Sequence, residues 1–235
     1  MDDALDLVRG AVRRVDFGYF VRPGSETDNG EPRVEACLGY AVRAGDAVLL
    51  VDTGMGSHPE VDEHYRPRRR PLGEALAPLG LTPGDVTHVT NCHLHFDHCG
   101  GNPELAGRPV FAQRSEVAAA RTAVDYTVPE LLDGSAFVEL DGEAEVLPGV
   151  LVVPTPGHTE GHQSFVVRLP DGSVVVAGQS HDTTTGYAAD VLALRARREG
   201  HPPPLPEPRG AWVARLQELD PRMVVLAHDY SVWMP

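Results

Sequence analysis

The chain has 235 residues, of which 42% are hydrophobic and 23% are charged, and this composition favours one folded domain over residues 1–235. All 20 cationic residues are arginine, which excludes Schiff-base lysines, attachment of pyridoxal phosphate and phosphate-binding lysines of the Walker type. The 34 acidic residues bring the formal net charge to −14, which disfavours nucleic acids and other polyanions as partners.

Histidine and cysteine usage suggests a metal site and a reducing compartment. Eleven histidines supply the commonest metal ligand. The three cysteines, Cys37, Cys92 and Cys99, are odd in number, and residues 1–10 lack the pattern of a secretory signal, so we expect free thiols in a cytoplasmic protein. Apolar stretches such as Ala47 to Val51 have the length of strands, so no membrane association is expected.

The first part of the chain reads as strands joined by turns. The expected strands are 15–22, 36–43 and 47–51, with Gly45 in a hairpin loop between the last two. Residues 24–33 are either a mobile lid or a disordered connection. Residues 54–71 are rich in proline and arginine, which indicates an exposed loop; its cluster from Arg66 to Arg70 either steers an anionic substrate or is simply solvated.

The rest of the chain alternates helices and strands. A helix at 72–79 ends at Gly80, Thr82 and Pro83 resemble a helix start, and Ser115 is expected to cap a helix at 116–124. Helices are also expected at 188–199 and 209–219, on either side of a proline-rich spacer at 201–208. The expected strands are 87–92, 136–140, 150–154, 164–169, 174–177 and 223–227. This alternation predicts an α/β architecture with helices outside sheets.

A dense group of metal-binding side chains follows the expected strand 87–92. The sequence from residue 93 reads HLHFDH. In an extended chain His93 and His95 point to the same side and can bind one cation, while Asp97 and His98 can reach a second cation nearby. The alternative is that these histidines only form hydrogen bonds within a loop.

Two further histidines lie at the ends of expected strands. His158 stands in a sharp Pro-Gly loop between two strands, and His228 follows the last strand. The sequence therefore predicts two adjacent zinc sites, each with an open position for water. The first comprises His93, His95 and His158, and the second comprises Asp97, His98 and His228.

Together these motifs resemble a known family. HLHFDH, VDTG at 51–54 and PTPGHTEGHQS at 154–164 are similar to the metallo-β-lactamase-fold hydrolases, and YTVPE at 126–130 and EVLPGV at 145–150 extend the resemblance to the N-acyl homoserine lactone lactonases. The resemblance runs from about Val34 to Asp229. It implies an αββα four-layer sandwich of two mixed β-sheets flanked by helices, two zinc ions and hydrolysis of a lactone ring.

One position departs from the family pattern. Gln179 stands where the family has an aspartate that bridges both metals, and an amide is a poorer ligand than a carboxylate. Either Gln179 binds weakly through its oxygen, or His181 or Asp182 replaces it as a ligand, or the second metal is bound loosely or is missing. The family also has a substrate-facing tyrosine where this chain has Asp182, and the nearest phenol is Tyr187.

Other polar residues near the motifs have simpler interpretations. Asp52 is expected to accept hydrogen bonds from loop amides or to orient a ligand imidazole. His162 is expected to be structural. Cys92 and Cys99 are expected to be buried, small and apolar in role. Ordinary roles are assigned to His58, His64, His88 and His201.

The leading hypothesis is a zinc-dependent hydrolase whose metal-bound hydroxide opens the lactone ring of N-acyl homoserine lactones. Asp97 would orient the water and pass its proton to the leaving alkoxide. The expected partner is a small-molecule lactone or ester, and the oligomeric state is left open. The alternatives are a hydrolase of another lactone, an ester or a thioester, and a metal-binding protein without catalysis.

Overall fold

The structure is a computed structural model that describes residues 11–27, 29–124 and 126–235. Residues 1–10, in which the sequence shows no secretory pattern, lie outside the described part of the chain.

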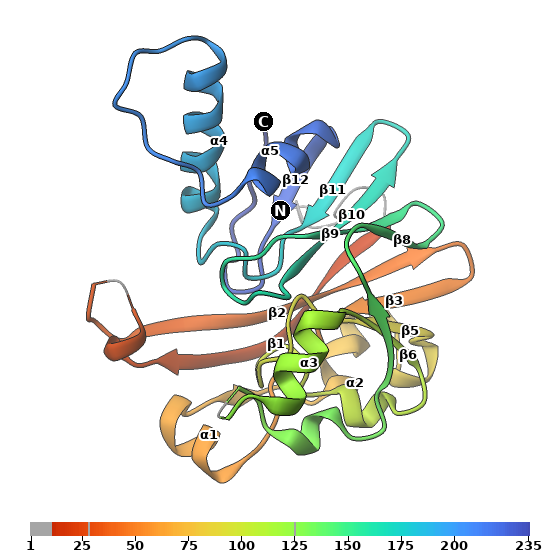
Figure 1. Cartoon of the computed structure of the whole chain (residues 1–235). Helices are drawn as coiled ribbons and strands as arrows, with labels where there is room; N and C mark the ends of the chain where they lie inside the picture. The colour runs from red at the N-terminus through yellow and green to blue at the C-terminus, as the bar shows by residue number, and fades with distance from the viewer. Residues whose placement is uncertain (1–10, 28, 125) are drawn as a thin grey trace.

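Two mixed β-sheets form the centre of the molecule (Figure 1). The first has the order β4-β1-β2-β3-β5-β6-β7 and the second the order β12-β11-β10-β9-β8. The strands of the first sheet are β1 (Val12–Arg22), β2 (Arg33–Ala44), β3 (Ala47–Val51), β4 (Arg68–Arg69), β5 (His88–Thr90), β6 (Pro109–Gln113) and β7 (Ala136–Leu140). Those of the second are β8 (Ala144–Leu147), β9 (Val150–Pro154), β10 (Gln163–Leu169), β11 (Gly172–Val176) and β12 (Pro221–Val225).

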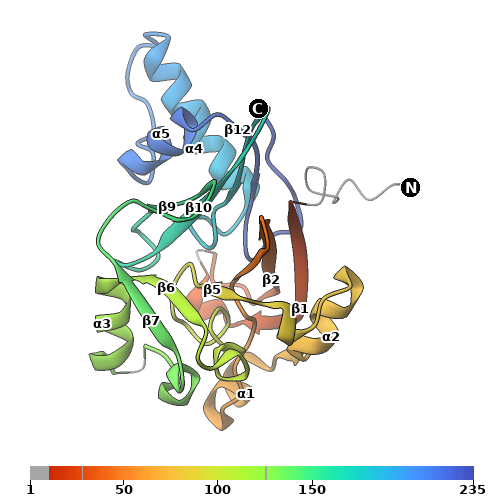
Figure 2. The ribbon, with the colours of Figure 1, turned by 90° about the vertical axis from the view of Figure 1, so that its right-hand side faces the viewer.

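Helices cover the outer faces of both sheets. Figure 2 shows α1, α2 and α3 beside the first sheet and α4 and α5 beside the second. Their bounds are α1 (Pro59–Tyr65), α2 (Leu72–Leu76), α3 (Arg114–Thr122), α4 (Thr184–Arg198) and α5 (Ala211–Glu218). Short 3-10 turns lie at η1 (Gly24–Glu26), η2 (Ala77–Leu79), η3 (Pro83–Asp85), η4 (Asn102–Leu105) and η5 (Pro129–Leu132). None of the helices in the described ranges is long and apolar enough to cross a membrane.

The alternation of apolar side chains explains the layers. In β3, Leu49 and Val51 pack between the sheets, whereas Leu50 packs under the helices of the first sheet. In β11, Val175 packs against the helical side of the second sheet, while its neighbours on either side face the first sheet. These two strands thus bury both faces, as expected for the central strands of sheets stacked between helices. The predicted αββα four-layer sandwich is confirmed.

Several predicted elements need correction. Strands β3, β7 and β9 have the predicted bounds, but β6 and β8 were not predicted. The predicted loop at 54–71 contains α1 and β4. No side chain of α1 is fully buried, and only Val61 and Tyr65 pack against the core, which is too weak an apolar pattern to predict a helix. Gln113, and not Ser115, occupies the N-cap position of α3. Helix α4 begins earlier than predicted, at a cap formed by the Thr183 hydroxyl.

The carboxyl ends of several parallel strands meet at one edge of the two sheets. Strands β3, β5 and β6 are parallel to one another, as are β11 and β12. Gln163, at the start of β10, ties the sheets together there: its backbone N–H donates to the Cys92 carbonyl (2.9 Å) and its side-chain amide donates to the Asn91 carbonyl (2.9 Å). The loops that carry the predicted ligands therefore start from a rigid base.

Candidate metal centre

The loop that follows β5 is held by Asp52, which lies directly after β3. Asp52 has a left-handed backbone (φ 59°), which is uncommon for a residue other than glycine. Its carboxylate accepts the backbone N–H of Cys92 (2.8 Å) and the Nδ1–H of His98 (3.0 Å). This agrees with the supporting role predicted for Asp52, and it leaves Nε2 of His98 facing the centre.

A second buried carboxylate, not singled out from the sequence, holds the other side of the loop. Glu116 on α3 is 1% exposed and accepts the Leu94 backbone N–H (2.7 Å), the Thr159 hydroxyl (2.8 Å) and the Tyr126 hydroxyl. It therefore joins the motif to the His158 loop and to Tyr126. The sequence shows only a glutamate in the first turn of the predicted helix, and its burial is visible only in the structure.

The structure brings together the first predicted group of ligands. His93 Nε2 lies 2.9 Å from His95 Nδ1, and His158 Nε2 lies 3.3 Å from the same atom. The candidate ligand atoms of all three residues lie within 4.8 Å of one another. Three imidazole nitrogens at this spacing can meet one divalent ion, with a position left open.

The second predicted group lies beside the first. Asp97 Oδ2 is 3.5 Å from Nε2 of both His98 and His228, and these two nitrogens are 3.2 Å apart. His228 donates Nδ1–H to the Ala36 carbonyl (2.7 Å), which turns its Nε2 toward the centre. Gln179 Oε1 lies 3.3 Å from His98 Nε2, so the amide faces this group of ligands.

Burial sets the protonation of the first group. It lowers the pKa of His95 to about 4 and that of His158 to about 3, and it holds the pKa of His93 well below its usual range. The neighbouring imidazoles add to this effect. These rings are therefore neutral near pH 7, which is the form that binds a metal.

The second group combines an anion with imidazoles. Burial would raise the pKa of Asp97, but the rings of His98 and His228 outweigh burial and lower it to about 2. Burial also opposes charge on His98, yet Asp97 and Asp52 raise the pKa of that ring, so a metal would displace its proton. The donor set fits a pair of divalent ions, with a single carboxylate among the two groups.

The residues proposed to replace Gln179 are engaged elsewhere. His181 contacts Asp190 through Nε2 (3.1 Å) and Ser180 through Nδ1 (3.2 Å). Asp182 accepts a hydrogen bond from Arg33 (3.1 Å). Neither residue belongs to the two groups described above. Tyr187 is fully buried, and its hydroxyl accepts a hydrogen bond from the side-chain amide of Gln217 (2.9 Å), so it does not line the site.

The three cysteines surround the motif. Cys37 Sγ donates to the Asp97 carbonyl (3.0 Å), Cys99 Sγ donates to the His95 carbonyl (3.2 Å), and Cys92 Sγ lies 3.2 Å from His93 Nδ1 and 3.3 Å from His98 Nδ1. Burial raises the pKa of Cys92 and of Cys99 to about 12, so both stay protonated. Their role is to hold the loop, which is more than the apolar role predicted from the sequence.

His162 has the structural role that was predicted. Its Nδ1 donates to the Thr155 carbonyl (3.0 Å) and its Nε2 accepts the Gln179 backbone N–H (3.1 Å). Both ring nitrogens are therefore used. His58 and His64, for which the sequence predicts ordinary roles, line a cavity in front of the candidate centre, and His64 also pairs with Glu26 (2.6 Å).

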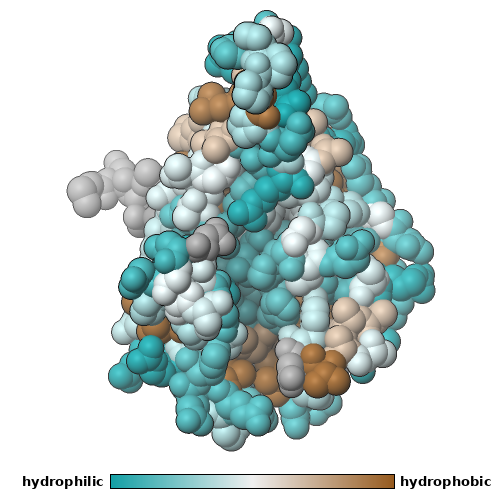
Figure 3. Space-filling view, turned by 60° about the vertical axis from the view of Figure 1, so that its left-hand side comes forward, coloured by the Kyte–Doolittle hydropathy of each residue, from teal (hydrophilic) through white to brown (hydrophobic). Residues whose placement is uncertain are grey.

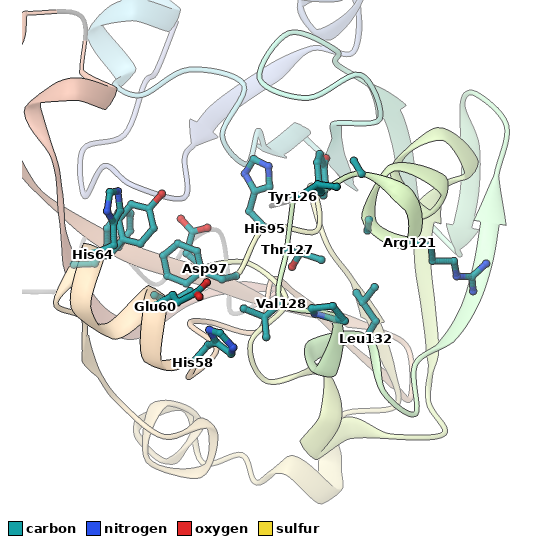
Figure 4. A pocket seen from close by; sticks show the side chains of 18 of the residues that line it. His58, Glu60, His64, His95, Asp97, Arg121, Tyr126, Thr127, Val128 and Leu132 are labelled. Carbon is teal, nitrogen blue, oxygen red and sulfur yellow. The ribbon is translucent and has the colours of Figure 1, made fainter.

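The cavity has a volume of about 1070 Å³ and reaches the candidate centre at His95, Asp97, His158 and Gln179. In Figure 4, His95 and Asp97 face its middle, α1 forms one side, and the segment from Tyr126 to Leu132 forms the other. Figure 3 shows a recess on this face that is hydrophilic in its middle and bordered by hydrophobic residues at its lower end. The apolar and aromatic lining consists of Phe20, Val61, Tyr65, Phe96, Ala120, Ala123, Val124, Val128, Pro129 and Leu132.

Comparisons with known proteins agree with this geometry. The chain is 32% identical over 155 residues to an N-acyl homoserine lactonase of Bacillus sp., a match that covers 58% of this chain and 60% of that protein. It is 30% identical over 171 residues to the N-acyl homoserine lactonase AiiA of Bacillus thuringiensis subsp. kurstaki, covering 65% of this chain and 66% of AiiA. The matches thus span about two thirds or less of these relatives.

Solved structures and sequence profiles extend the comparison. The crystal structure of a quorum-quenching N-acyl homoserine lactone lactonase superimposes with a TM-score of 0.73 at 25% identity, covering 93% of this chain and 92% of the other. The profile of the Metallo-beta-lactamase superfamily matches residues 32–228, which include every candidate ligand. On the fold, the arrangement of the candidate ligands and these comparisons, the chain belongs to the metallo-beta-lactamase superfamily.

Proposed function

We propose that this protein is a zinc-dependent lactonase that hydrolyses N-acyl homoserine lactones. The observation that carries the proposal is the pairing of two groups of ligands at the base of a cavity of about 1070 Å³ with an apolar and aromatic lining. Such a cavity can accept an acyl chain while the ring faces the ligands. The similarity to N-acyl homoserine lactonases supports the choice of substrate.

The proposed ligands of the first ion are His93, His95 and His158. Those of the second are Asp97, His98 and His228, with Gln179 Oε1 as a weak neutral donor. When bound, zinc ions would supply a hydroxide nucleophile at neutral pH and would polarise the ester carbonyl.

Asp97 is the proposed catalytic residue among the protein side chains. Its carboxylate faces the cavity and is ionised near pH 7, because the adjacent imidazoles hold its pKa at about 2. It can orient the attacking water, accept its proton and pass that proton to the leaving alkoxide when the ring opens. General acid–base assistance of this kind is worth about 10²- to 10⁴-fold in rate.

A pH-indicator assay of the metal-loaded protein tests the proposal, because each hydrolysis releases a proton. The panel contains N-acyl homoserine lactones of several chain lengths, alkyl lactones, aryl esters and thioesters. We expect turnover of the N-acyl homoserine lactones, loss of it after chelation, and its return when zinc is added. His93→Gln should abolish turnover, whereas the matched control His201→Gln, at an exposed position, should not.

Two results would redirect the assignment. Cleavage of aryl esters or thioesters without any lactone would favour another hydrolase on this fold. Binding of zinc with no turnover of the panel would favour a metal-binding protein without catalysis.

A further inference from the structure

Arg22, the last residue of β1, lies on the wall of the cavity beside the candidate centre. It lines the cavity together with Asp97 and His95, and 14% of its side chain is exposed. A fixed cation is therefore present close to the place where the substrate would react.

The guanidinium is held from behind by a buried carboxylate. Arg22 Nε donates to Glu35 Oε1 (2.8 Å), and Glu35, on the paired strand β2, is only 3% exposed. Glu35 also accepts a hydrogen bond from Arg33 (2.7 Å), which in turn donates to Asp182 (3.1 Å). The ring of Phe20 lies 5.5 Å from the guanidinium carbon. These contacts fix the orientation of Arg22 and leave its terminal nitrogens for another partner.

The N–H groups of those terminal nitrogens are not used by the protein. Among the described residues, no hydrogen bond is formed by Nη1 or Nη2 of Arg22, and Nη1 lies 3.7 Å from a carboxylate oxygen of Glu26. Glu26 already accepts hydrogen bonds from His64 and Tyr65. Arg121, the other arginine of the cavity, differs: it is 55% exposed and donates to Glu139.

We propose that Arg22 is a specificity-determining residue, whose terminal nitrogens donate hydrogen bonds to the amide carbonyl oxygen of an N-acylated lactone. The inference rests on the proposed function. The ring carbonyl would be directed to the ligand groups, so the acceptor that reaches Arg22 must be attached close to the ring. In an N-acyl homoserine lactone, the amide carbonyl occupies that position, whereas a simple alkyl lactone has no acceptor there. A charge-assisted hydrogen bond from a pre-oriented guanidinium would favour the former.

The test compares Arg22→Met and Arg22→Lys with the wild-type protein and with Arg195→Met as control, because Arg195 is 72% exposed and does not line the cavity. The substrates are N-hexanoyl homoserine lactone and an alkyl γ-lactone of similar length without an amide. Arg22→Met should raise KM for the amide-bearing lactone about tenfold to hundredfold, with kcat changed less than about threefold, because a hydrogen bond to a charged group is lost. It should leave kcat/KM for the alkyl lactone within about threefold. The KM of Arg22→Lys for the amide-bearing lactone should lie between those of the wild-type protein and Arg22→Met. Arg195→Met should change the kinetics of neither substrate.

A purely structural role for Arg22 predicts a different result, namely an equal loss of kcat/KM for both lactones. That outcome, or an unchanged KM for the amide-bearing lactone, would overturn the proposal. Metal content and thermal unfolding are measured on the same samples. If Arg22→Met does not fold, Arg22→Lys decides the question, since the ratio of kcat/KM for the two lactones must change by at least about threefold.

Binding provides a readout that does not depend on turnover. The ligand is the amide-bearing γ-lactam, in which N–H replaces the ring oxygen. It should bind the metal-loaded wild-type protein at least about tenfold more tightly than it binds Arg22→Met. If that variant does not fold, the lactam should bind the wild-type protein at least about threefold more tightly than it binds Arg22→Lys. Equal affinities would refute the role of Arg22 even in a protein without lactonase activity. Absence of lactone hydrolysis by the wild-type protein, by contrast, would refute the proposed function.

Discussion

Replacing Gln179 with aspartate should have opposite effects on metal binding and on the stability of the metal-free protein. The side chain is 3% exposed, its Oε1 lies 3.3 Å from His98 Nε2, and its backbone N–H is bound by His162. Asp97 is the only carboxylate in the two groups of ligands. A second carboxylate at position 179 would therefore change the charge of the centre, and it would also shorten the buried side chain by one methylene group.

The expected magnitudes follow from this geometry. Two unit charges about 4 Å apart attract by about 4 kcal/mol at an effective dielectric constant of about 20, and a divalent ion doubles this value. Desolvation of the buried carboxylate removes much of the gain. We expect a net gain of about 3 kcal/mol, which is roughly a hundredfold decrease in Kd for the second ion. Without metal, burial of a second carboxylate near Asp97 should cost more than its attraction to the protonated His98 ring returns, and the free energy of unfolding should fall by about 1–3 kcal/mol.

The assay uses Gln179→Asn as the matched control, because asparagine has the shape of aspartate without its charge. Metal-free samples of both variants are titrated with zinc against a competing chelator, and each is unfolded by heat with and without zinc. The aspartate variant should bind the second ion more tightly than the asparagine variant and should melt at a lower temperature when metal-free. Equal zinc affinities in the two variants would show that the charge at this position does not control the second site, and the reasoning would fail.

Three further predictions concern residues within the candidate centre and beside it. Asp97→Asn should lower kcat about 100-fold or more with KM within about threefold, and near-normal kcat in steady-state assays would exclude Asp97 as the proton carrier. Cys92→Ala should weaken zinc binding by about 10- to 100-fold while Cys92→Ser keeps most of the affinity; equal losses in competitive titrations would mean that hydrogen bonding by the thiol is not its role. Glu116→Ala should lower the free energy of unfolding by about 2–4 kcal/mol, because three donors lose their acceptor, and a change below about 1 kcal/mol in denaturant titrations would contradict this.

Local patterns were sufficient to predict much of the fold. Strands such as β9 are short apolar runs bounded by turns, and their bounds were correct. The signal was missing where apolar residues were too few or too scattered. No side chain of helix α1 is fully buried, and in β8 the exposed and half-buried residues give no clear alternation. Packing between distant segments, which no local pattern records, determines these elements.

The candidate ligands could be predicted because the sequence concentrates them. Four of them are among the six residues of HLHFDH, and the two remaining histidines, His158 and His228, lie in or after turns at strand ends. Supporting residues are different, because their contacts connect distant parts of the chain. Glu116 binds a backbone N–H of residue 94, and Arg22 is oriented by Glu35, which the hairpin between β1 and β2 brings beside it. Such residues become identifiable only when the strand pairing is known.

Gln179 and Arg22 together determine the charge at the base of the cavity. The resemblance to the family shows that Gln179 stands where a carboxylate is expected. Only the structure shows that Asp182 is hydrogen-bonded to Arg33 and does not take the place of that carboxylate. Arg22 adds a cation on the adjacent wall, and its buried partner Glu35 is shared with Arg33. With metals bound, the positive charge of the ions and of Arg22 would thus exceed the negative charge of the Asp97 carboxylate. The oxygens of the substrate would be the remaining acceptors, which favours a substrate with a second carbonyl near the ring over one that has the ring carbonyl alone.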